Sequence, residues 1–288
     1  MEPMRLSAPE VTREGSSTLL ESEVTMQGRG GQRLWIRTTG EAVPATNDAF
    51  VAFALLPAMK LGVPLVSEGP VSRSLLEEAL PGVQRVHAIW GEDTRHPRRG
   101  RFTPIDVRAP LGDDAPRGPG VGVFFSGGVD SSFSLLEARE AITDLVFIHD
   151  FEAAFPEEPR RAALAGVERV ARAFGKRLVQ VETNAKEVFG DIVSWHHYHG
   201  AFLIGCALPQ QGRLGLVHIP SSVDVGRIVP WGSHPLLDPA WSTAATTFVH
   251  DRLDVTRFEK TAVVARDRVL LENLRVCWAP HQNCGWCS

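Results

Sequence analysis

The pattern of hydrophobic and polar positions differs between the first and second parts of the chain. Alternating positions in EVTMQGRGGQRLWIRTT, residues 23–39, predict two strands around a glycine-rich turn. Asn47 and Asp48 are typical of the start of a helix, here over 49–62. Residues 71–90 predict two helical pieces, the second opened by Pro81. With short strands expected at 64–69 and 101–110, residues 19–112 are predicted to form a small α+β domain after a disordered leader, residues 1–18.

From residue 119 the chain alternates apolar strands with amphipathic helices. The strands are expected at 121–125, 144–151, 177–183 and 215–223, and the helices at 131–141, 158–175 and 195–210. This alternation is typical of a parallel sheet covered on both faces. We therefore expect an α/β protein, with a Rossmann-like nucleotide-binding domain over 119–288. The Pro-, Gly- and Asp-rich segment 111–120 predicts a linker between the two domains.

Composition limits the class of protein. The 288 residues are 43% hydrophobic and carry a net charge of −4, with a pI of about 6.2. That balance argues against a protein that binds nucleic acid through bulk positive charge. The one basic cluster, RHPRRGR at 95–101, is either a solvated loop or a contact for RNA or phosphate. Without an apolar run of about 18 residues or a signal peptide, we expect a cytoplasmic protein with no membrane partner.

The strongest chemical signal follows the strand expected at 121–125. A loop of small and polar residues leads directly into a helix: Ser126, Gly127, Gly128, Val129, Asp130, Ser131 and Ser132. Adjacent glycines let the backbone approach an anion closely, and a helix N-terminus adds N–H groups and a positive dipole end. The segment lacks the lysine of a Walker A loop and the spacing of a dinucleotide fingerprint. It predicts a site for phosphate or pyrophosphate.

The sequence SGGVDS at 126–131 resembles the SGGxDS motif of the PP-loop ATP pyrophosphatases, members of the adenine nucleotide alpha hydrolase superfamily. The resemblance implies a HUP-type fold that binds ATP and Mg²⁺ and releases pyrophosphate. It implies catalytic roles for Asp130 and Ser131, with Asp130 orienting the loop or holding Mg²⁺. It also implies that the end of the second strand of this domain lies near adenine and ribose, namely His149, Asp150 and Phe151.

Two later segments resemble parts of the 7-cyano-7-deazaguanine synthases. TRFEKTAVVAR at 256–266 resembles their lysine-bearing helix, which implies that Lys260 is a catalytic phosphate ligand. From the residues alone, a surface lysine is the alternative.

The C-terminal cysteines, Cys277, Cys284 and Cys287, resemble the zinc segment of the same synthases, which implies a structural Zn²⁺ site. Free thiols are the alternative. The fourth ligand stays open between His281, Cys206 and a residue beyond Ser288. Those synthases carry their SGGxDS motif close to the N-terminus, so residues 19–112 depart from their pattern. A group of bacterial PP-loop proteins resembles this chain in both its N-terminal module and its PWGSHPLLDPxWST motif.

Candidate substrate contacts concentrate in three segments. They are His199 and Gly200 in WHHYHG, Ser222 and Asp224 after the strand at 215–223, and Ser233, His234 and Asp238 in a Trp- and Pro-rich loop. Imidazoles can bind phosphate or transfer protons, and a stiff aromatic loop can form a pocket wall. A purely structural role is the alternative for both the histidines and the loop.

These features predict an AMP-forming, ATP-dependent ligase. A carboxylate or amide oxygen of a small-molecule acceptor would be adenylated, and a nitrogen or sulfur nucleophile would then displace AMP. Two other functions stay open: a tRNA thiolation or modification enzyme, and a regulatory module that binds nucleotide without turnover.

Overall fold

The computed structural model describes residues 2–40, 46–91, 101–149, 151, 157–276 and 283. The chain forms two compact units that alternate along the sequence. The first unit comprises residues 1–119, 183–215 and 229–249, and the second comprises 120–182, 216–228 and 250–288. The first change of unit falls at the expected boundary near 119, but the chain then changes unit four more times. The units therefore differ from the contiguous domains, 19–112 and 119–288, that the sequence suggested.

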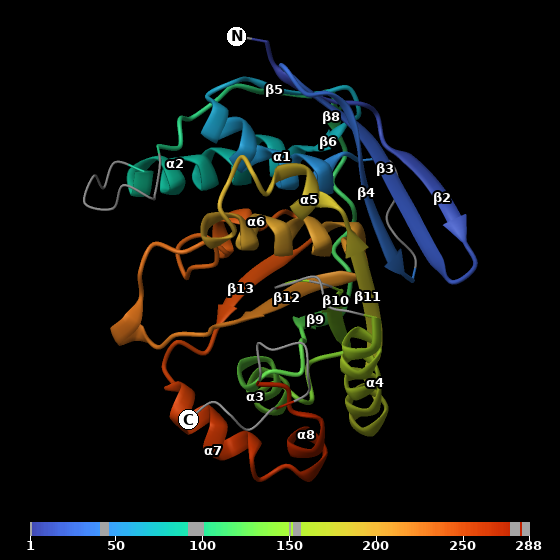
Figure 1. Cartoon of the computed structure of the whole chain (residues 1–288), viewed down its shortest axis with the longest axis vertical. Helices are drawn as coiled ribbons and strands as arrows, with labels where there is room; N and C mark the ends of the chain where they lie inside the picture. The colour runs from blue at the N-terminus through green and yellow to red at the C-terminus, as the bar shows by residue number, and fades with distance from the viewer. Residues whose placement is uncertain are drawn as a thin grey trace. The chain divides into compact units, whose positions relative to one another are not determined.

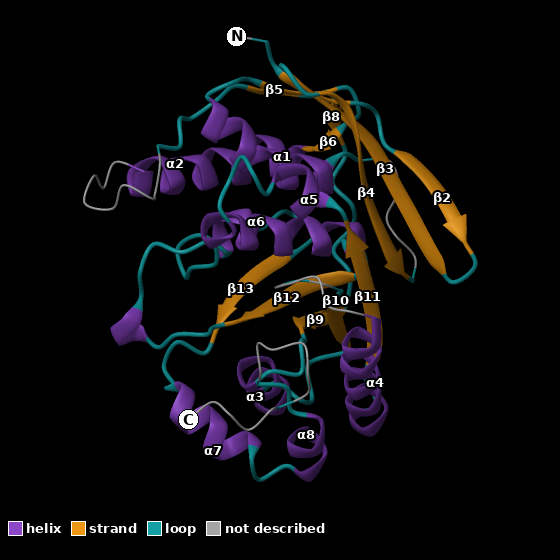
Figure 2. Ribbon diagram, viewed as in Figure 1, coloured by secondary structure: helices purple, strands orange, loops and turns teal. Residues whose placement is uncertain are grey.

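The second unit is built on parallel strands. β9 (Gly120–Phe124), β10 (Asp144–Ile148) and β11 (Arg177–Thr183) are parallel neighbours in that order. On the other side of β9 the order continues with β12 (Leu214–Pro220) and then β13 (Thr247–Asp251). Figures 1 and 2 show these strands with the helices of the unit beside them. The α/β class expected from the sequence is confirmed.

Helices cover one face of these strands and form the core with them. They are α3 (Val129–Glu137), α4 (Glu157–Phe174), α7 (Arg257–Val264) and α8 (Arg268–Asn273). Alternate residues of β9 and β10, such as Val123, Leu145 and Phe147, point to this face, as the two-residue period of a strand requires. They pack against Phe133 of α3 and Val167 of α4, among other buried residues. This core fixes the two elements that flank the serine- and glycine-rich loop.

The first unit contains a second set of strands. Their order is β4 (Gly30–Thr39), β3 (Ser17–Met26), β1 (Met4–Leu6), β5 (Leu65–Ser67) and β7 (Val107–Arg108), with β2 (Glu10–Glu14) also on β3. β3 and β4 form the antiparallel hairpin that the alternating pattern predicted, whereas β1, β5 and β7 are parallel. A separate parallel pair joins β6 (Val71–Ser72) to β8 (Leu111–Gly112).

Helices of the first unit pack around a hydrophobic centre. They are α1 (Asp48–Leu61), α2 (Leu80–Gly91), α5 (Ala185–Phe189) and α6 (Trp195–Ala207), and a π-helical turn at Leu75–Ala79 precedes α2. α1 is apolar on every side and is buried from Asp48 to Met59. It packs against α6, where Gly205 leaves room for the ring of Phe53; a Cβ at Gly205 would lie 2.3 Å from that ring. Short 3-10 turns occur at Leu208–Gln210, Val225–Arg227 and Pro239–Trp241.

Two expectations about the first 120 residues were wrong. Residues 1–18, predicted to be a disordered leader, contain β1, β2 and the start of β3. Met4 and Leu6 are buried because alternate residues of a strand point to the same face. The strand has only three residues, so the sequence shows no alternating pattern there. The predicted linker is also packed: a Cβ on Gly118 would lie 2.3 Å from the backbone of Arg213, so only glycine fits there. Within the described residues, no helix has the length and apolar character needed to span a membrane.

Candidate functional site

The loop between β9 and α3 has the geometry of an anion site. Gly127 has φ of 77°, a left-handed conformation that glycine adopts without strain, and Gly128 is the N-cap of α3. No side chain caps this helix start, and the first N–H groups of any α-helix have no partners within the helix. Ser131 Oγ donates to the Gly128 carbonyl at 3.1 Å, which closes the turn. The Gly128 N–H donates to Ser126 Oγ at 3.3 Å, so the N–H groups that follow it in the turn are the ones that can bind an oxyanion.

The position of the loop in the sheet also favours a ligand. β10 and β11 follow β9 on one side, whereas β12 and β13 lie on its other side. The strand order thus reverses at β9, and open α/β sheets bind ligands at such switch points, beyond the carboxyl ends of the strands. The loop 126–131 follows the carboxyl end of β9, and Ser221 follows that of β12.

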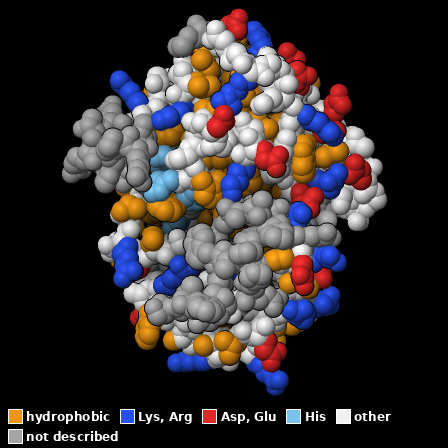
Figure 3. Space-filling view, viewed as in Figure 1, with side chains coloured by type: hydrophobic (Ala, Val, Ile, Leu, Met, Phe, Trp, Pro, Cys, Tyr) orange, Lys and Arg blue, Asp and Glu red, His pale blue; other side chains and the backbone are white. Residues whose placement is uncertain are grey.

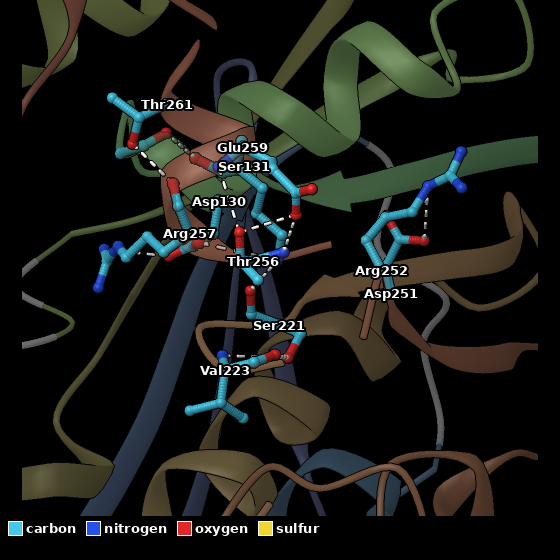
Figure 4. Close-up of polar contacts among 12 residues, drawn as sticks. Asp130, Ser131, Ser221, Val223, Asp251, Arg252, Thr256, Arg257, Glu259 and Thr261 are labelled. Carbon is cyan, nitrogen blue, oxygen red and sulfur yellow. Dashed lines mark hydrogen bonds and ion pairs between the residues drawn. The ribbon is translucent and has the colours of Figure 1, made fainter. Parts of the chain in front are cut away.

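Two cations from α7 surround the carboxylate of Asp130. Arg257 Nη2 lies 3.1 Å from Asp130 Oδ2, and Lys260 Nζ lies 3.8 Å from Oδ1. Lys260 is 1% exposed, and its Nζ also donates to the Ser221 carbonyl at 2.7 Å. Figure 4 shows Asp130 with its ion-pair partner Arg257, in a close-up that also draws Ser221. Lys260 is therefore part of this cluster and is not a surface lysine.

Local sequence explains why α7 presents these two cations. Thr256 accepts from the Glu259 backbone N–H, and Glu259 accepts from the Thr256 backbone N–H, which forms a capping box. The cap starts the helix at Arg257, and residues three apart share one face of a helix. Sequence analysis missed Arg257, although this spacing from Lys260 was a usable signal.

Burial dominates the electrostatics of the cluster. Burial raises the pKa of the Asp130 carboxyl, and the positive charges of Arg257 and Lys260 oppose that rise. Burial lowers the pKa of Lys260, and the carboxylates of Asp130 and Asp251 oppose that fall. Asp130 Oδ1 is buried and accepts no hydrogen bond, although it lies within ion-pair distance of Lys260. The cluster therefore has an acceptor oxygen that is not saturated.

A C-terminal segment lies across the loop; we call residues 273–276 the strap. The Arg275 backbone N–H donates to the Gly127 carbonyl at 2.9 Å. Asn283 holds the strap in turn, because its side chain accepts from the Val276 N–H at 2.9 Å and donates to the Leu274 carbonyl at 2.5 Å. A hollow of about 140 Å³ lies between the strap, the loop and α4. Sequence analysis missed these contacts because they link residues far apart in the chain.

The other residues of the second unit that were predicted to bind nucleotide or substrate differ in burial and in their contacts. His149 follows β10, and its Nε2 lies 3.0 Å from Gln180 Oε1, at the same sheet edge as the loop. Phe151 is half-buried, and Asp150 lies outside the described residues. Ser222 is exposed, and Asp224 caps a 3-10 turn by accepting from the Gly226 N–H at 2.9 Å.

The remaining substrate candidates form a histidine-rich module in the first unit. A Cβ on Gly200 would lie 1.7 Å from the Gly232 carbonyl oxygen, so the Trp-rich loop touches the backbone of α6. Asp238 is fully buried and accepts from Ser233 Oγ at 2.6 Å and from the His234 N–H at 3.1 Å. Figure 3 shows histidine side chains gathered beside hydrophobic ones on the face in view. These contacts support a structural role for the module; its role in substrate binding stays a prediction.

His199 has both ring nitrogens occupied. Nδ1 lies 3.0 Å from the Trp195 carbonyl, and Nε2 lies 3.1 Å from the Ser233 backbone N–H. Because a carbonyl only accepts and an N–H only donates, Nδ1 carries the proton and Nε2 accepts. Burial lowers the pKa of His199 to about 4. In this conformation the ring is neutral and joins α6 to the Trp-rich loop.

The described residues differ in how well they suit the expected metals. Carboxylate oxygens are the ligands that Mg²⁺ prefers, and Asp130 Oδ1 accepts no hydrogen bond, although Lys260 Nζ lies 3.8 Å from it. Cys277, Cys284, Cys287 and His281 lie outside the described residues, so the zinc site stays a prediction that elemental analysis can test. Among the described residues, no group of three or more metal-ligating side chains is placed to hold a metal ion. Cys206 is fully buried, and burial raises the pKa of its thiol well above the ordinary value.

Scans of this chain against protein-family models, curated proteins and solved structures found no match in any of the three. Its function must therefore be argued from its own residues.

Proposed function

We propose that this protein is an ATP pyrophosphatase-type enzyme that adenylates an oxygen of a small-molecule acceptor. One observation carries the proposal: an uncapped, glycine-rich helix start at a sheet switch point bears Asp130, whose carboxylate lies beside the buried Lys260 and the exposed Arg257. Oxyanions bind to such helix starts, and cations beside them stabilise charge that develops on phosphates. The motif SGGVDS, which resembles that of the PP-loop enzymes, selects the α-phosphate as the reacting centre.

In the proposed reaction, a carboxylate or amide oxygen of the acceptor attacks the α-phosphorus of ATP. The bond from that phosphorus to the bridging oxygen breaks, and the electron pair leaves with pyrophosphate. The loop N–H groups and Lys260 hold the phosphate oxygens, and Asp130 is the residue that would hold Mg²⁺. A bound Mg²⁺ would neutralise charge on the leaving pyrophosphate. A nitrogen or sulfur nucleophile then attacks the adenylate and releases AMP. Catalysis is thus mainly positioning and electrostatic stabilisation.

The test is to incubate the protein with ATP and a cell metabolite extract and to separate the nucleotide products. We expect AMP and pyrophosphate, with ADP absent as a product. Asp130→Ala and Ser131→Ala should abolish pyrophosphate release while the far-UV circular dichroism stays native. Asp113→Ala is the control, because Asp113 is an exposed carboxylate in the first unit. ADP as the sole product, or unchanged ATP consumption in both loop variants, would refute the proposal.

The same experiment separates the two alternative functions. ATP binding without turnover would favour a regulatory module, and RNA that copurifies with the protein would favour tRNA modification. A sulfur-carrying role for Cys206 has little support, because its thiol is buried and protonated. Most of the basic cluster 95–101 lies outside the described residues.

A further inference from the structure

Arg257 and Lys260 face the same carboxylate but are held very differently. Lys260 is buried, and its Nζ is fixed by the Ser221 carbonyl at 2.7 Å. The Arg257 side chain is 61% exposed, and its ion pair with Asp130 spans 3.1 Å. Water screens an ion pair that has an exposed member, so this contact is weak. Lys260 is thus a fixed cation of the cluster, whereas Arg257 is free to exchange partners.

Asp130 is the residue for which two kinds of cation compete. Its Oδ2 is paired with Arg257, whereas its Oδ1 is buried without a hydrogen bond. A divalent cation on this carboxylate would be repelled by the Arg257 guanidinium at 3.1 Å and by the Lys260 ammonium at 3.8 Å. Because Lys260 is fixed, Arg257 is the repelling cation that can move away when a metal binds.

An oxyanion on the loop gives Arg257 a new partner. Asp130 lies in the first turn of α3, next to the N–H groups that follow Gly128. The Arg257 guanidinium is therefore within one side-chain movement of a phosphate group bound there. Guanidinium groups bind phosphate oxygens in pairs, and these bonds are stronger than an exposed ion pair.

We propose that Arg257 is an exchangeable phosphate ligand, which pairs with Asp130 in the empty site and transfers to a phosphate oxyanion when a divalent cation takes its place. This inference rests on the proposed function, because it assigns the loop to a phosphate-containing substrate. Asp130 and Arg257 then act together. A bound phosphate oxyanion draws Arg257 away from Asp130 and so favours metal binding, and a bound divalent cation displaces Arg257 from Asp130 and so frees it for the phosphate.

The test uses two separate titrations, one with pyrophosphate and one with a divalent cation. They are kept apart because pyrophosphate chelates divalent cations in solution. Pyrophosphate is titrated into metal-free protein by calorimetry, and Mn²⁺, as a probe for Mg²⁺, is titrated without anion and followed by electron paramagnetic resonance. Arg257→Ala should weaken pyrophosphate binding about tenfold, because one charge-assisted contact is lost. The same variant should strengthen Mn²⁺ binding several-fold, because Asp130 loses one of the two cations beside it while Lys260 stays.

Arg268→Ala is the matched control. Arg268 is also exposed and paired with a carboxylate, Glu272 at 2.8 Å, and its loss changes the net charge equally. It should leave both affinities within twofold of the wild type. A merely structural role for Arg257 would move both affinities in the same direction or move neither, and either result overturns the inference.

The outcomes also distinguish the inference from the proposed function. If the wild type releases pyrophosphate from ATP and Arg257→Ala leaves both affinities unchanged, the inference fails and the proposed function stands. If the wild type binds neither pyrophosphate nor Mn²⁺, both fail. Thermal unfolding of each variant, followed by circular dichroism, shows whether the fold is retained.

Discussion

Gly200, in α6, has no side chain, and this allows the Trp-rich loop to approach the helix backbone closely. Helices disfavour glycine by about 1 kcal/mol relative to alanine, so a glycine inside α6 needs a reason. The reason is the Gly232 carbonyl, which would lie 1.7 Å from a Cβ at position 200. Because this oxygen belongs to backbone, it can move away only if the whole Trp-rich loop moves.

We expect Gly200→Ala to lower the free energy of unfolding by about 1–3 kcal/mol, the usual cost of overpacking. Gly166→Ala, in α4, is the control, since its Cβ would be 3.7 Å from the nearest atom. That variant should be neutral or more stable by up to about 1 kcal/mol because alanine favours the helix. Urea unfolding measures both. Equal stability of Gly200→Ala and the wild type would contradict the close approach of the loop.

A second residue-scale prediction concerns His87, which is 1% exposed with neither ring nitrogen hydrogen-bonded. Burial, with a smaller effect of His197, lowers its pKa to about 3. Between about pH 6.5 and 3 the unfolded chain therefore binds a proton that the folded chain does not, so stability falls as the pH falls below about 6.5. His199, with a pKa of about 4, acts in the same direction.

Each of these histidines should add up to about 1.4 kcal/mol per pH unit to that slope. His87→Phe keeps an aromatic ring beside Trp90 and Phe102 and removes the titrating group. We expect its stability between pH 5 and 6 to depend less steeply on pH than that of the wild type, as measured by urea unfolding at several pH values. An identical slope would show that His87 is not buried in the neutral form.

Among the residues of the candidate site, those within a contiguous motif could be named from the sequence, and their role in binding stays a prediction. The motif SGGVDS indicated Ser126 to Ser131 as candidates. The resemblance of a later helix indicated Lys260, whose Nζ lies 3.8 Å from Asp130 Oδ1 in the structure. Arg257 and the strap were not found, because their importance depends on contacts with residues more than 100 positions away.

At the scale of elements, local periodicity predicted the strands and helices that are long enough to show it. The hairpin β3–β4, helix α1 and the succession from β9 to β11 lie within a few residues of their expected positions. β1 and β7 are short, with three and two residues, and their pairing is determined by neighbours distant in sequence. Such strands have too few residues to show an alternating pattern.

The capping box of α7 is the element-scale feature with the clearest consequence. We expect Thr256→Ala to cost about 1 kcal/mol in the free energy of unfolding, since the Glu259 N–H loses its acceptor. It should also weaken pyrophosphate binding a few-fold, because the first turn of α7 carries Arg257 and Lys260. Thr261→Ala is the control, because its hydroxyl donates to the Arg257 carbonyl within the same helix and does not cap it. Urea unfolding and calorimetry measure the two effects, and a variant that matches the control in both would contradict them.

At the scale of the whole molecule, the alternation of the two units could not be predicted. It depends on pairings such as that of Asn184, whose side chain accepts from the Trp35 N–H at 2.9 Å and donates to the Arg33 carbonyl at 2.7 Å. Local patterns show that a segment is a strand or a helix, but they do not show which distant segment it joins. The sequence therefore suggested contiguous domains where the chain has interleaved ones.

Interleaving predicts that the first 119 residues will not fold alone. Their central helix, α1, is apolar on every side and packs against α6, which lies at Trp195–Ala207. A fragment of residues 1–119 would lack Phe202 and Gly205 of α6, which lie against Phe53, and exposing that ring to water would cost roughly 1.5–3 kcal/mol. We expect this fragment to bind a hydrophobic dye and to melt without cooperativity, whereas the whole chain melts cooperatively. A cooperative melt of the fragment would contradict the expectation.

The same alternation sets the order of events on the ribosome. Because the first unit takes its last segment from residues 229–249, it cannot be completed until those residues have left the exit tunnel. At about 5–20 residues per second, synthesis from Leu61 to Ala207 takes roughly 7–30 s, so α1 waits that long for α6. During that interval its apolar surface is open to chaperones and to other nascent chains. The length of time between the synthesis of α1 and that of α6 should therefore influence how much of this protein reaches its folded state in a cell.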